Sequence, residues 1–378
     1  MNIKFNNYDI AIKMITVIGG GPIGSIAANT CVKENEVILF EEHKREKQPV
    51  QCAGLISISG LERLGLKELS KNSGNAAGIV QNKVRGARIF SKSGKVVEID
   101  AGCDKAYVVD RRKFDEYLLN SAIDSGVEFV NEKVTDTKNL PIKGQNKPEK
   151  IILATGTRYS HHHQLNFNVP EVLSSAQYEM EIECDPDFVE LHFNSPGFFS
   201  WIIPGSEGTA RIGSCTYRNP KHYLENFIKN LKLDGRIKNN PKNLNKTGGA
   251  IPIYNPHLKT EYDNIILAGD AAAQVKATTG GGIVMGGIAA GCVNSDYGYE
   301  KEWRGKIGKE LYLHLFIRNF LNRLSEKELV ELLTLADDYK DIIQKKGDMD
   351  MVFNTAFSLM KNPGFSLKMF GLFIRSFF

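Results

Sequence analysis

Residues 14–24 read MITVIGGGPIG and decide the fold of the chain. The apolar run 14–18 predicts a buried parallel strand, and the glycines after it form the pattern G-x-G-x-x-G. The small residues 25–32 then predict a helix, and residues 37–40 predict a second strand. This order of strand, turn, helix and strand is the beginning of a βαβ unit of the kind that binds dinucleotides.

The residue types in this turn suit a pyrophosphate. Gly19 allows the tight turn, Gly21 lets the pyrophosphate approach the backbone, and Gly24 lets the helix pack closely on the strand. Ile23, between the last two glycines in the sequence, is also expected at the cofactor. Glu41 follows the second strand, where a carboxylate accepts hydrogen bonds from the adenosine ribose. The sequence therefore predicts a dinucleotide site, and the alternative is a glycine turn without a ligand.

A second segment, far along the chain, favours FAD over a nicotinamide nucleotide. Residues 265–267 predict a buried strand, and Asp270 follows it in the sequence Gly-Asp at the expected start of a helix. A carboxylate there can hold a ribityl hydroxyl of FAD, and the structural alternative is an N-cap aspartate. Gly281, Gly282 and Ile283 begin another predicted helix, whose free N–H groups can hydrogen-bond to the pyrimidine edge of a flavin. The alternative there is a flexible glycine loop.

Other segments between these two carry weaker signals. Residues 151–156 read IILATG, a strand followed by Ala-Thr-Gly, as is common where the chain passes under the cofactor of a flavoprotein. Arg111, in Asp-Arg-Arg at the start of a predicted helix, can face the pyrophosphate, unless this is only a solvated charge cluster. The adjacent histidines 161–163 predict a polar loop and no metal site, since neighbouring side chains diverge.

The composition excludes several classes of protein. The 378 residues include 48 Lys and Arg against 44 Asp and Glu, a formal net charge of +4 that does not favour a nucleic-acid binder. No apolar run reaches the ~18 residues that a membrane span requires. The 6 cysteines form no CxxC pair, and the first residues are polar and mixed in charge. We therefore expect a cytoplasmic protein without disulfides.

Together these elements predict an α/β plus β fold in three parts. We expect a discontinuous Rossmann-type FAD-binding domain, an inserted antiparallel-sheet substrate domain, and a helical C-terminal region. The FAD-binding domain is expected to comprise residues 14–75, 105–160 and 246–298. The substrate domain is expected at residues 76–104 and 161–245, and the helical region at residues 299–378.

Three more segments carry a family resemblance. Residues 49–54 read PVQCAG, residues 107–111 read YVVDR, and residues 196–204 read PGFFSWIIP. With the FAD-type motifs, they resemble the FAD-dependent geranylgeranyl reductase family of the p-hydroxybenzoate hydroxylase superfamily. The resemblance runs from about residue 14 to about residue 295 and fades in the helical tail.

The sequence departs from the family pattern at several positions. Phe199 and Ile203 stand where the motif P-x-x-Y-x-W-x-F-P has Tyr and Phe, and Gln51 stands where Arg is usual. Gly54 follows Cys-Ala one residue earlier than usual. These changes put the particular substrate in doubt and leave the expected reductase activity standing.

The resemblance implies which residues line the two parts of the site. Those expected at the FAD are Cys52, Ala53, Gly54, Glu41, Arg111, Val134, Asp270, Gly282 and Ile283. Those expected at an apolar substrate tunnel are Pro196, Phe198, Phe199, Trp201, Ile203 and Pro204, which could equally be ordinary strand-core residues.

The resemblance also implies the reaction. It is saturation of isoprenoid C=C bonds in archaeal-type membrane lipids or related polyprenyl groups, with hydride from flavin N5. Cys52 is a candidate proton donor, or else a spacer beside the ring. The electron donor is expected to be ferredoxin, a deazaflavin or NAD(P)H.

The C-terminal segment suggests a membrane contact. Residues 351–378 hold Lys361, Lys368 and Arg375 and no acid, at a spacing that keeps the three on roughly one helical face. Residues 361–378 could form an interfacial helix on the inner face of the cell membrane, or a helix packed on the body of the protein.

Two other functions stay open at this point. One is a flavin-dependent aromatic monooxygenase or halogenase of the same superfamily, which would need a polar pocket for a ring. The other is a non-catalytic prenyl-binding escort protein, which would leave Glu41, Arg111 and Asp270 unexplained.

Overall fold

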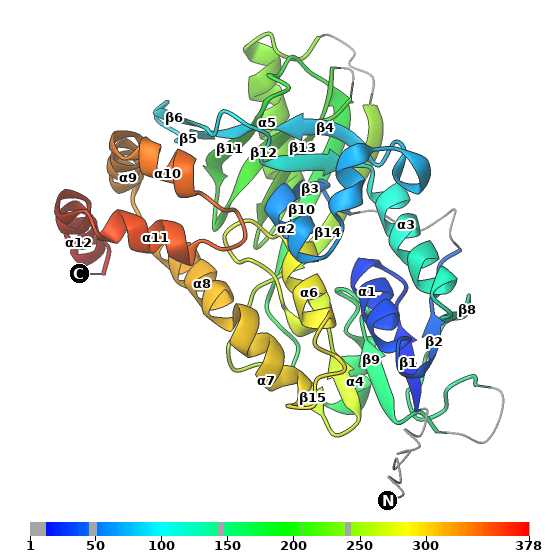
Figure 1. Ribbon diagram of the computed structural model, residues 1–378. Helices are drawn as coiled ribbons and strands as arrows, with labels where there is room; N and C mark the ends of the chain where they lie inside the picture. The colour runs from blue at the N-terminus through cyan, green and yellow to red at the C-terminus, as the bar shows by residue number, and fades with distance from the viewer. Residues whose placement is uncertain (1–12, 45–50, 143–146, 207, 239–242, 378) are drawn as a thin grey trace, which may run out of the picture.

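The computed structural model describes residues 13–44, 51–142, 147–206, 208–238 and 243–377. The described elements form three sheets and a C-terminal group of helices (Figure 1). Pro49 and Val50 of the PVQCAG segment lie outside the described residues.

The first sheet is the parallel sheet that the sequence predicts. Its strand order is β15-β16-β9-β1-β2-β8, and only the edge strand β15 runs antiparallel. The strands are β1 (Met14–Ile18), β2 (Glu36–Phe40), β8 (Glu128–Val130), β9 (Lys150–Leu153), β15 (Glu261–Tyr262) and β16 (Ile265–Leu267). Three distant parts of the chain therefore meet side by side, with β1 between β2 and β9.

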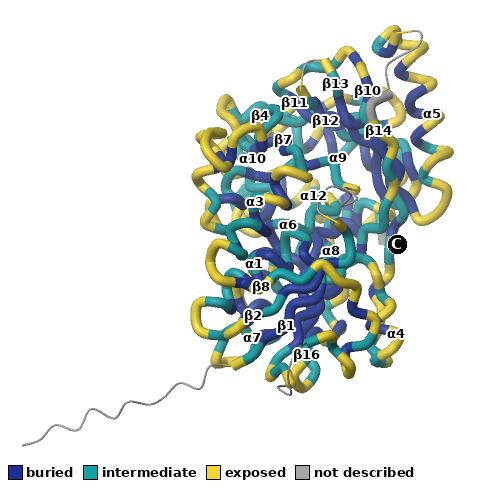
Figure 2. Tube along the Cα trace, turned by 90° about the vertical axis from the view of Figure 1, so that its right-hand side faces the viewer, coloured by how far each residue is buried: buried dark blue, intermediate teal, exposed yellow. Residues whose placement is uncertain are grey.

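Helices cover one face of this sheet. They are α1 (Pro22–Cys31), α3 (Arg111–Asp124) and α6 (Ile283–Ala290). Small residues such as Ala27 and Ala28 on α1 are fully buried, which lets the helix lie close to the strands. In Figure 2 the strands of this sheet form a buried band inside an exposed shell.

The opposite face is partly covered by α4 (Ser160–Leu165), which contains the histidine run. The prediction of a polar loop is wrong here, because His161 and His162 are 5% and 0% exposed. The Nε2 atom of His162 lies 2.9 Å from the carbonyl oxygen of Ala271. An imidazole with one satisfied nitrogen can be buried among apolar groups.

The second sheet has seven strands in the order β14-β10-β13-β12-β11-β5-β6. They are β5 (Gly86–Phe90), β6 (Val96–Asp100), β10 (Val172–Glu181), β11 (Phe188–Ser195), β12 (Phe198–Pro204), β13 (Thr209–Thr216) and β14 (Asn243–Pro252). The expectation of a purely antiparallel sheet is wrong at one pair, since β5 and β11 run parallel. They are distant in sequence, so no hairpin forces them to be antiparallel.

Helix α5 (Pro220–Leu233) packs on one face of this sheet, and the other face carries the aromatic residues of β12. Strand β14 continues as an edge strand past the domain boundary expected at residue 245. The third sheet has three strands in the order β3 (Leu55–Ser57), β7 (Ala106–Val109) and β4 (Val80–Val84). Three short helices lie between β3 and β4 in the sequence, namely α2 (Ile58–Arg63), η2 (Lys67–Lys71) and η3 (Gly74–Ala76).

The C-terminal part is helical, as predicted. It comprises α7 (Tyr299–Trp303), η5 (Arg304–Gly308), α8 (Lys309–Leu321), α9 (Glu326–Asp338), α10 (Lys340–Lys346), α11 (Phe353–Met360) and α12 (Pro363–Phe377). Leu329 and Leu333 of α9 pack on Val97 of β6, so α9 lies against the β6 end of the second sheet (Figure 1).

No helix within the described ranges is both long and apolar enough to cross a membrane. All 6 cysteines are unpaired thiols.

Candidate active site

The first glycine turn leaves open space at the N-terminus of α1. Gly19 has a φ of +108°, and a Cβ there would lie 2.3 Å from the carbonyl oxygen of Ala154. A Cβ on Gly24 would lie 1.8 Å from the carbonyl oxygen of Gly19. By contrast, no atom lies within 4 Å of the place that a Cβ would take on Gly21. The turn is therefore crowded at Gly19 and Gly24 and open at Gly21. The open space lies at the N-terminus of α1, whose free N–H groups attract phosphate.

Glu41 lies directly after β2 and is held by backbone and side-chain donors. One carboxylate oxygen accepts a hydrogen bond from the N–H of Gly20 at 2.7 Å. The other accepts from the N–H of His43 at 2.8 Å, and the Nδ1 atom of His43 lies at the same distance. These contacts fix the carboxylate at the cavity wall, where the sequence places it.

Asp270 lies on the short 3-10 turn η4 (Gly269–Ala272). The prediction that a helix starts here is wrong beyond this one turn. Because β16 leads into a chain that turns back at once, the next helix begins only at α6. A Cβ on Gly282 would lie 2.7 Å from the Asp270 Oδ1 atom, so the carboxylate lies beside the N-terminus of α6. Burial raises the pKa of Asp270 to about 6, although Arg111 opposes this rise. Within the described residues, no hydrogen bond from the protein to this carboxylate is found.

The second glycine turn precedes α6. Gly280 has a φ of +72°, which favours glycine, and Gly282 is the residue just before the helix. Gly281, Gly282 and Ile283 all line the same cavity as the first turn. Ile23 and Val134 line it as well.

Arg111 lies in the cavity wall and is paired with a residue that the sequence reasoning missed. Its Nε and Nη2 atoms donate to the carboxylate of Asp115 at 3.0 and 3.1 Å. Burial works to lower the pKa of Arg111, but Asp115 and the nearby Cys52 outweigh it and raise that pKa. The i, i+4 spacing of Arg111 and Asp115 on a predicted helix was the signal that could have revealed this pair.

The turn 52–54 brings Cys52, Ala53 and Gly54 to the cavity. The N–H of Gly54 approaches the Cys52 sulfur at 3.4 Å. The buried Arg211 of β13 donates to the carbonyl oxygens of Ala53 at 2.7 Å and Val109 at 3.1 Å, which ties this turn to the second sheet. Sequence reasoning missed Arg211, although one charged residue inside an otherwise uncharged strand was a visible signal.

Strand β12 supplies an aromatic wall. Phe198, Phe199, Trp201 and Ile203 are each at most 8% exposed and line the cavity. The rings of Phe198 and Phe199 are stacked with centroids 4.2 Å apart. The Trp201 indole donates to Gln177 at 3.2 Å, which satisfies its N–H away from water.

Two of the expected substrate residues do not reach the cavity. Pro196 lies exposed in the turn before β12, and Pro204 ends that strand. Neither lines the cavity, because each lies at an end of the strand that carries the wall.

One cavity of about 930 Å³ joins all these parts. It runs from Gly21 and Glu41 past Asp270 to the β12 wall. It then continues between the C-terminal helices, where its lining includes Ile317, Ile343, Met349, Val352 and Leu359. A single space thus has a polar end with glycine turns and an apolar end.

The residues fit FAD. The open space beside Gly21 suits a pyrophosphate, and the oriented Glu41 suits ribose hydroxyls. The half-buried carboxylate of Asp270 lines the cavity, where it can accept from a hydroxyl donor. Within the described part of the chain, no group of three His, Cys, Asp or Glu side chains could hold a metal ion.

The fold and the cavity define a protein with the architecture of flavoprotein oxidoreductases. A digeranylgeranylglycerophospholipid reductase of Methanocaldococcus jannaschii is 30% identical to this chain, over 92% of this chain and 96% of that one. An uncharacterized protein of the same organism is 33% identical, over 94% and 96%. The chain belongs to the digeranylgeranylglycerophospholipid reductase family. No family model matches the sequence.

Solved structures agree on the fold. A geranylgeranyl bacteriochlorophyll reductase-like protein from Thermoplasma acidophilum superposes with a TM-score of 0.75 at 22% identity, covering 96% of this chain and 100% of that one. The flavin-dependent brominase Bmp2 superposes with a TM-score of 0.61 at 16% identity, covering 96% and 93%. At these identities the likeness establishes the fold alone.

Proposed function

We propose that this protein is an FAD-dependent reductase that saturates C=C bonds in geranylgeranyl or other polyprenyl chains of archaeal-type membrane lipids. The observation that carries the proposal is the single cavity, which touches both glycine turns at one end and apolar helices at the other. When bound and reduced, FAD would supply the hydride for one alkene carbon, and a proton would be needed for the other.

The residues of the chain would have distinct tasks in this reaction. The glycine turns, Glu41 and Asp270 would hold the cofactor. Phe198, Phe199 and Trp201 would hold the prenyl chain in a dry channel, because aromatic walls exclude water and restrict the orientation of a hydrocarbon. Cys52, in the turn beside Arg111, is the proposed proton donor.

The test is reduction of a defined lipid. The purified protein is loaded with FAD, reduced with dithionite and incubated with a digeranylgeranyl glycerophospholipid. The expected product gains two hydrogens for each double bond, as read by mass spectrometry. A flavin-loaded protein that leaves the lipid unchanged would contradict the proposal, and a colourless protein that takes up no FAD would favour the escort function. Oxygen consumption stimulated by a phenol would favour a monooxygenase.

We further propose that the natural reductant is ferredoxin, a deazaflavin or NAD(P)H. The net charge of +4 allows an acidic carrier to approach. Stopped-flow measurement of flavin reduction by each donor separates the three, and the donor that reduces the flavin faster than turnover is the competent one.

We also propose a peripheral location on the inner face of the cell membrane, with a contact surface wider than residues 361–378. Both basic side chains of α12 are engaged within the protein, since Lys368 lies 3.1 Å from Asp338 and Arg375 pairs with Glu331. The helix therefore packs on α9, and its other side is exposed.

Both α11 and α12 expose apolar side chains. They are Phe353, Phe357, Met360, Leu367, Phe370 and Ile374, all at least 40% exposed. The inner side of α11 lines the cavity through Ala356 and Leu359. A lipid entering the cavity from this side would leave the bilayer where the protein contacts it. Flotation with anionic vesicles tests this proposal, and an equal soluble fraction with and without vesicles would contradict it.

A further inference from the structure

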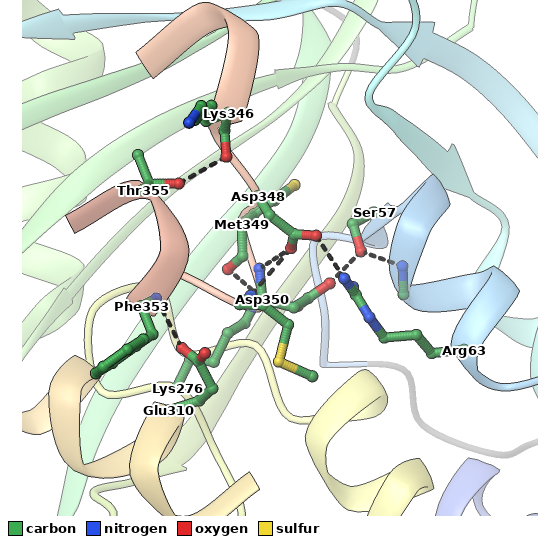
Figure 3. Close-up of polar contacts among 12 residues, drawn as sticks. Ser57, Arg63, Lys276, Glu310, Lys346, Asp348, Met349, Asp350, Phe353 and Thr355 are labelled. Carbon is green, nitrogen blue, oxygen red and sulfur yellow. Dashed lines mark hydrogen bonds and ion pairs between the residues drawn. The ribbon is translucent and has the colours of Figure 1, made fainter. Parts of the chain in front are cut away.

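A buried ion pair connects the second glycine turn to the segment between α10 and α11 (Figure 3). This segment, residues 347–352, is called the linker below. The Nζ atom of Lys276 lies 2.5 Å from the Oδ1 atom of Asp350, and the two side chains are 6% and 1% exposed. Lys276 also donates to the carbonyl oxygen of Met349 at 3.0 Å, and Ser57 donates to the Asp350 carboxylate. The pair is thus surrounded by partners, which a buried ion pair requires.

On one side, the backbone and the side chain of Lys276 support the glycine turn. The backbone N–H of Lys276 donates to the carbonyl oxygen of Gly281 at 3.1 Å, and the N–H of Gly280 donates to that of Lys276 at 2.8 Å. A Cβ on Gly281 would lie 2.8 Å from the Lys276 Cε atom, so the turn rests on this side chain.

A second connection runs parallel to the ion pair through His314 of α8. Its Nε2 atom lies 3.2 Å from the carbonyl oxygen of Asp350, and its Nδ1 atom lies 2.6 Å from the Thr278 hydroxyl. A carbonyl only accepts, so Nε2 donates and Nδ1 accepts from the hydroxyl. Burial, aided by Lys276, lowers the pKa of His314 to about 4 and keeps this arrangement neutral.

On the other side, the linker forms part of the cavity wall. Met349 lines the cavity and packs against the cluster that contains Ala53, Phe199 and Trp201. Asp348 fastens the same linker to α2 through Arg63 at 2.7 Å, without touching the glycine turn. Among the described residues, two ion pairs therefore hold the linker, and only the Asp350 pair reaches the turn.

We propose that Lys276 and Asp350 are positioning residues that fix the cofactor end and the substrate end of the cavity relative to each other. Their ion pair holds the glycine turn in the shape that receives the flavin ring, and the same contact holds Met349 against the wall that receives the prenyl chain. This inference rests on the proposed function, because it assigns the two ends of the cavity to cofactor and substrate.

The test compares the two ion pairs. Apoprotein is titrated with FAD by flavin fluorescence, and KM and kcat are measured for a digeranylgeranyl glycerophospholipid with dithionite-reduced enzyme. Asp350→Asn is expected to raise both the Kd for FAD and the KM for the lipid roughly tenfold. The matched control Asp348→Asn loosens the same linker and is expected to raise KM while the Kd for FAD stays within about twofold of the parent.

Asp350→Asn leaves an ammonium group buried without its carboxylate, so a second variant guards against misfolding. K276M/D350N removes both charges, nearly keeps the volume and leaves Ser57 an acceptor, and it is expected to fold and still to bind FAD more weakly, since the contact of Lys276 to Met349 is lost. Parental FAD affinity in this folded variant, or equal effects of Asp348→Asn and Asp350→Asn on both constants, would overturn the inference. A parent that binds no FAD or reduces no lipid would instead contradict the proposed function.

Discussion

At the scale of single residues, Asp270 has the clearest conflict between stability and ligand binding. Its side chain is half-buried, burial raises its pKa to about 6, and it lies where a ribityl hydroxyl would donate. We predict that Asp270→Asn raises the free energy of unfolding of the apoprotein by roughly 1 kcal/mol, because a neutral amide is easier to bury. The same change should weaken FAD binding about tenfold or more. Urea unfolding of apoprotein and an FAD titration measure the two effects, and a loss in both would contradict the prediction.

Cys52 tests the proposed proton transfer. We predict that Cys52→Ala slows lipid reduction in a single turnover by about 100-fold, a typical contribution of a positioned acid, and leaves FAD binding within a few-fold of the parent. Cys52→Ser should be slowed to a similar degree, since a hydroxyl is a weaker acid than a thiol. If both variants reduced the lipid as fast as the parent, Cys52 would be only a spacer beside the ring.

His314 gives stability a pH dependence whose sign can be worked out. Burial lowers its pKa from 6.5 to about 4, so between these values the unfolded chain binds a proton that the folded chain does not. Its contribution to stability is complete above pH 6.5 and is lost as the pH falls toward 4, by at most roughly 1.4 kcal/mol per pH unit. We predict a flatter pH dependence for His314→Gln, measured by urea unfolding across this range. Equal slopes for parent and variant would contradict this assignment.

At the scale of elements, the outer side of α11 offers a change that should affect function and not folding. Phe353 and Phe357 are 50% and 54% exposed, so replacing both by Ser should change the free energy of unfolding by no more than about 0.5 kcal/mol each. We predict that the double variant floats less with anionic vesicles than the parent. Leu233→Ser at the end of α5, 77% exposed, is a control for apolar exposure outside α11 and α12. A similar loss of flotation in this control would show that the contact is not specific to α11 and α12.

The elements also show what the sequence could and could not predict. The first βαβ unit was predictable because glycine spacing and apolar runs are local signals, and β1, α1 and β2 lie close to the predicted ranges. The parallel pairing of β5 with β11 was not, because it depends on contacts between distant segments. For the same reason the linker carboxylate of Asp350 gave no signal, since its partner Lys276 lies far away in the sequence. The pairing of Lys368 and Arg375 with α9 was equally invisible, and it changed the expected membrane surface.

At the scale of the whole molecule, the cavity is built from segments that only the folded chain brings together. Gly21, Glu41, Asp270 and Gly282 come from widely separated parts of the sequence and line one space. A ligand that contacts all of them binds only the folded state, so it stabilises that state by mass action. With free FAD at 100 times its Kd, the gain in the free energy of unfolding should be about 2.7 kcal/mol.

Gly21 separates this effect from ordinary folding. Its φ is −69° and its Cβ position is empty, so Gly21→Ala should leave the apoprotein as stable as the parent. The added methyl group would stand where a pyrophosphate approaches, and we predict that the rise in Tm with FAD is then lost. Gly24→Ala is the opposite case, since its Cβ would lie 1.8 Å from the carbonyl oxygen of Gly19 and should destabilise the apoprotein itself. Thermal unfolding of both variants with and without FAD distinguishes the two roles. An undiminished FAD shift in Gly21→Ala would mean that the pyrophosphate does not lie at this turn.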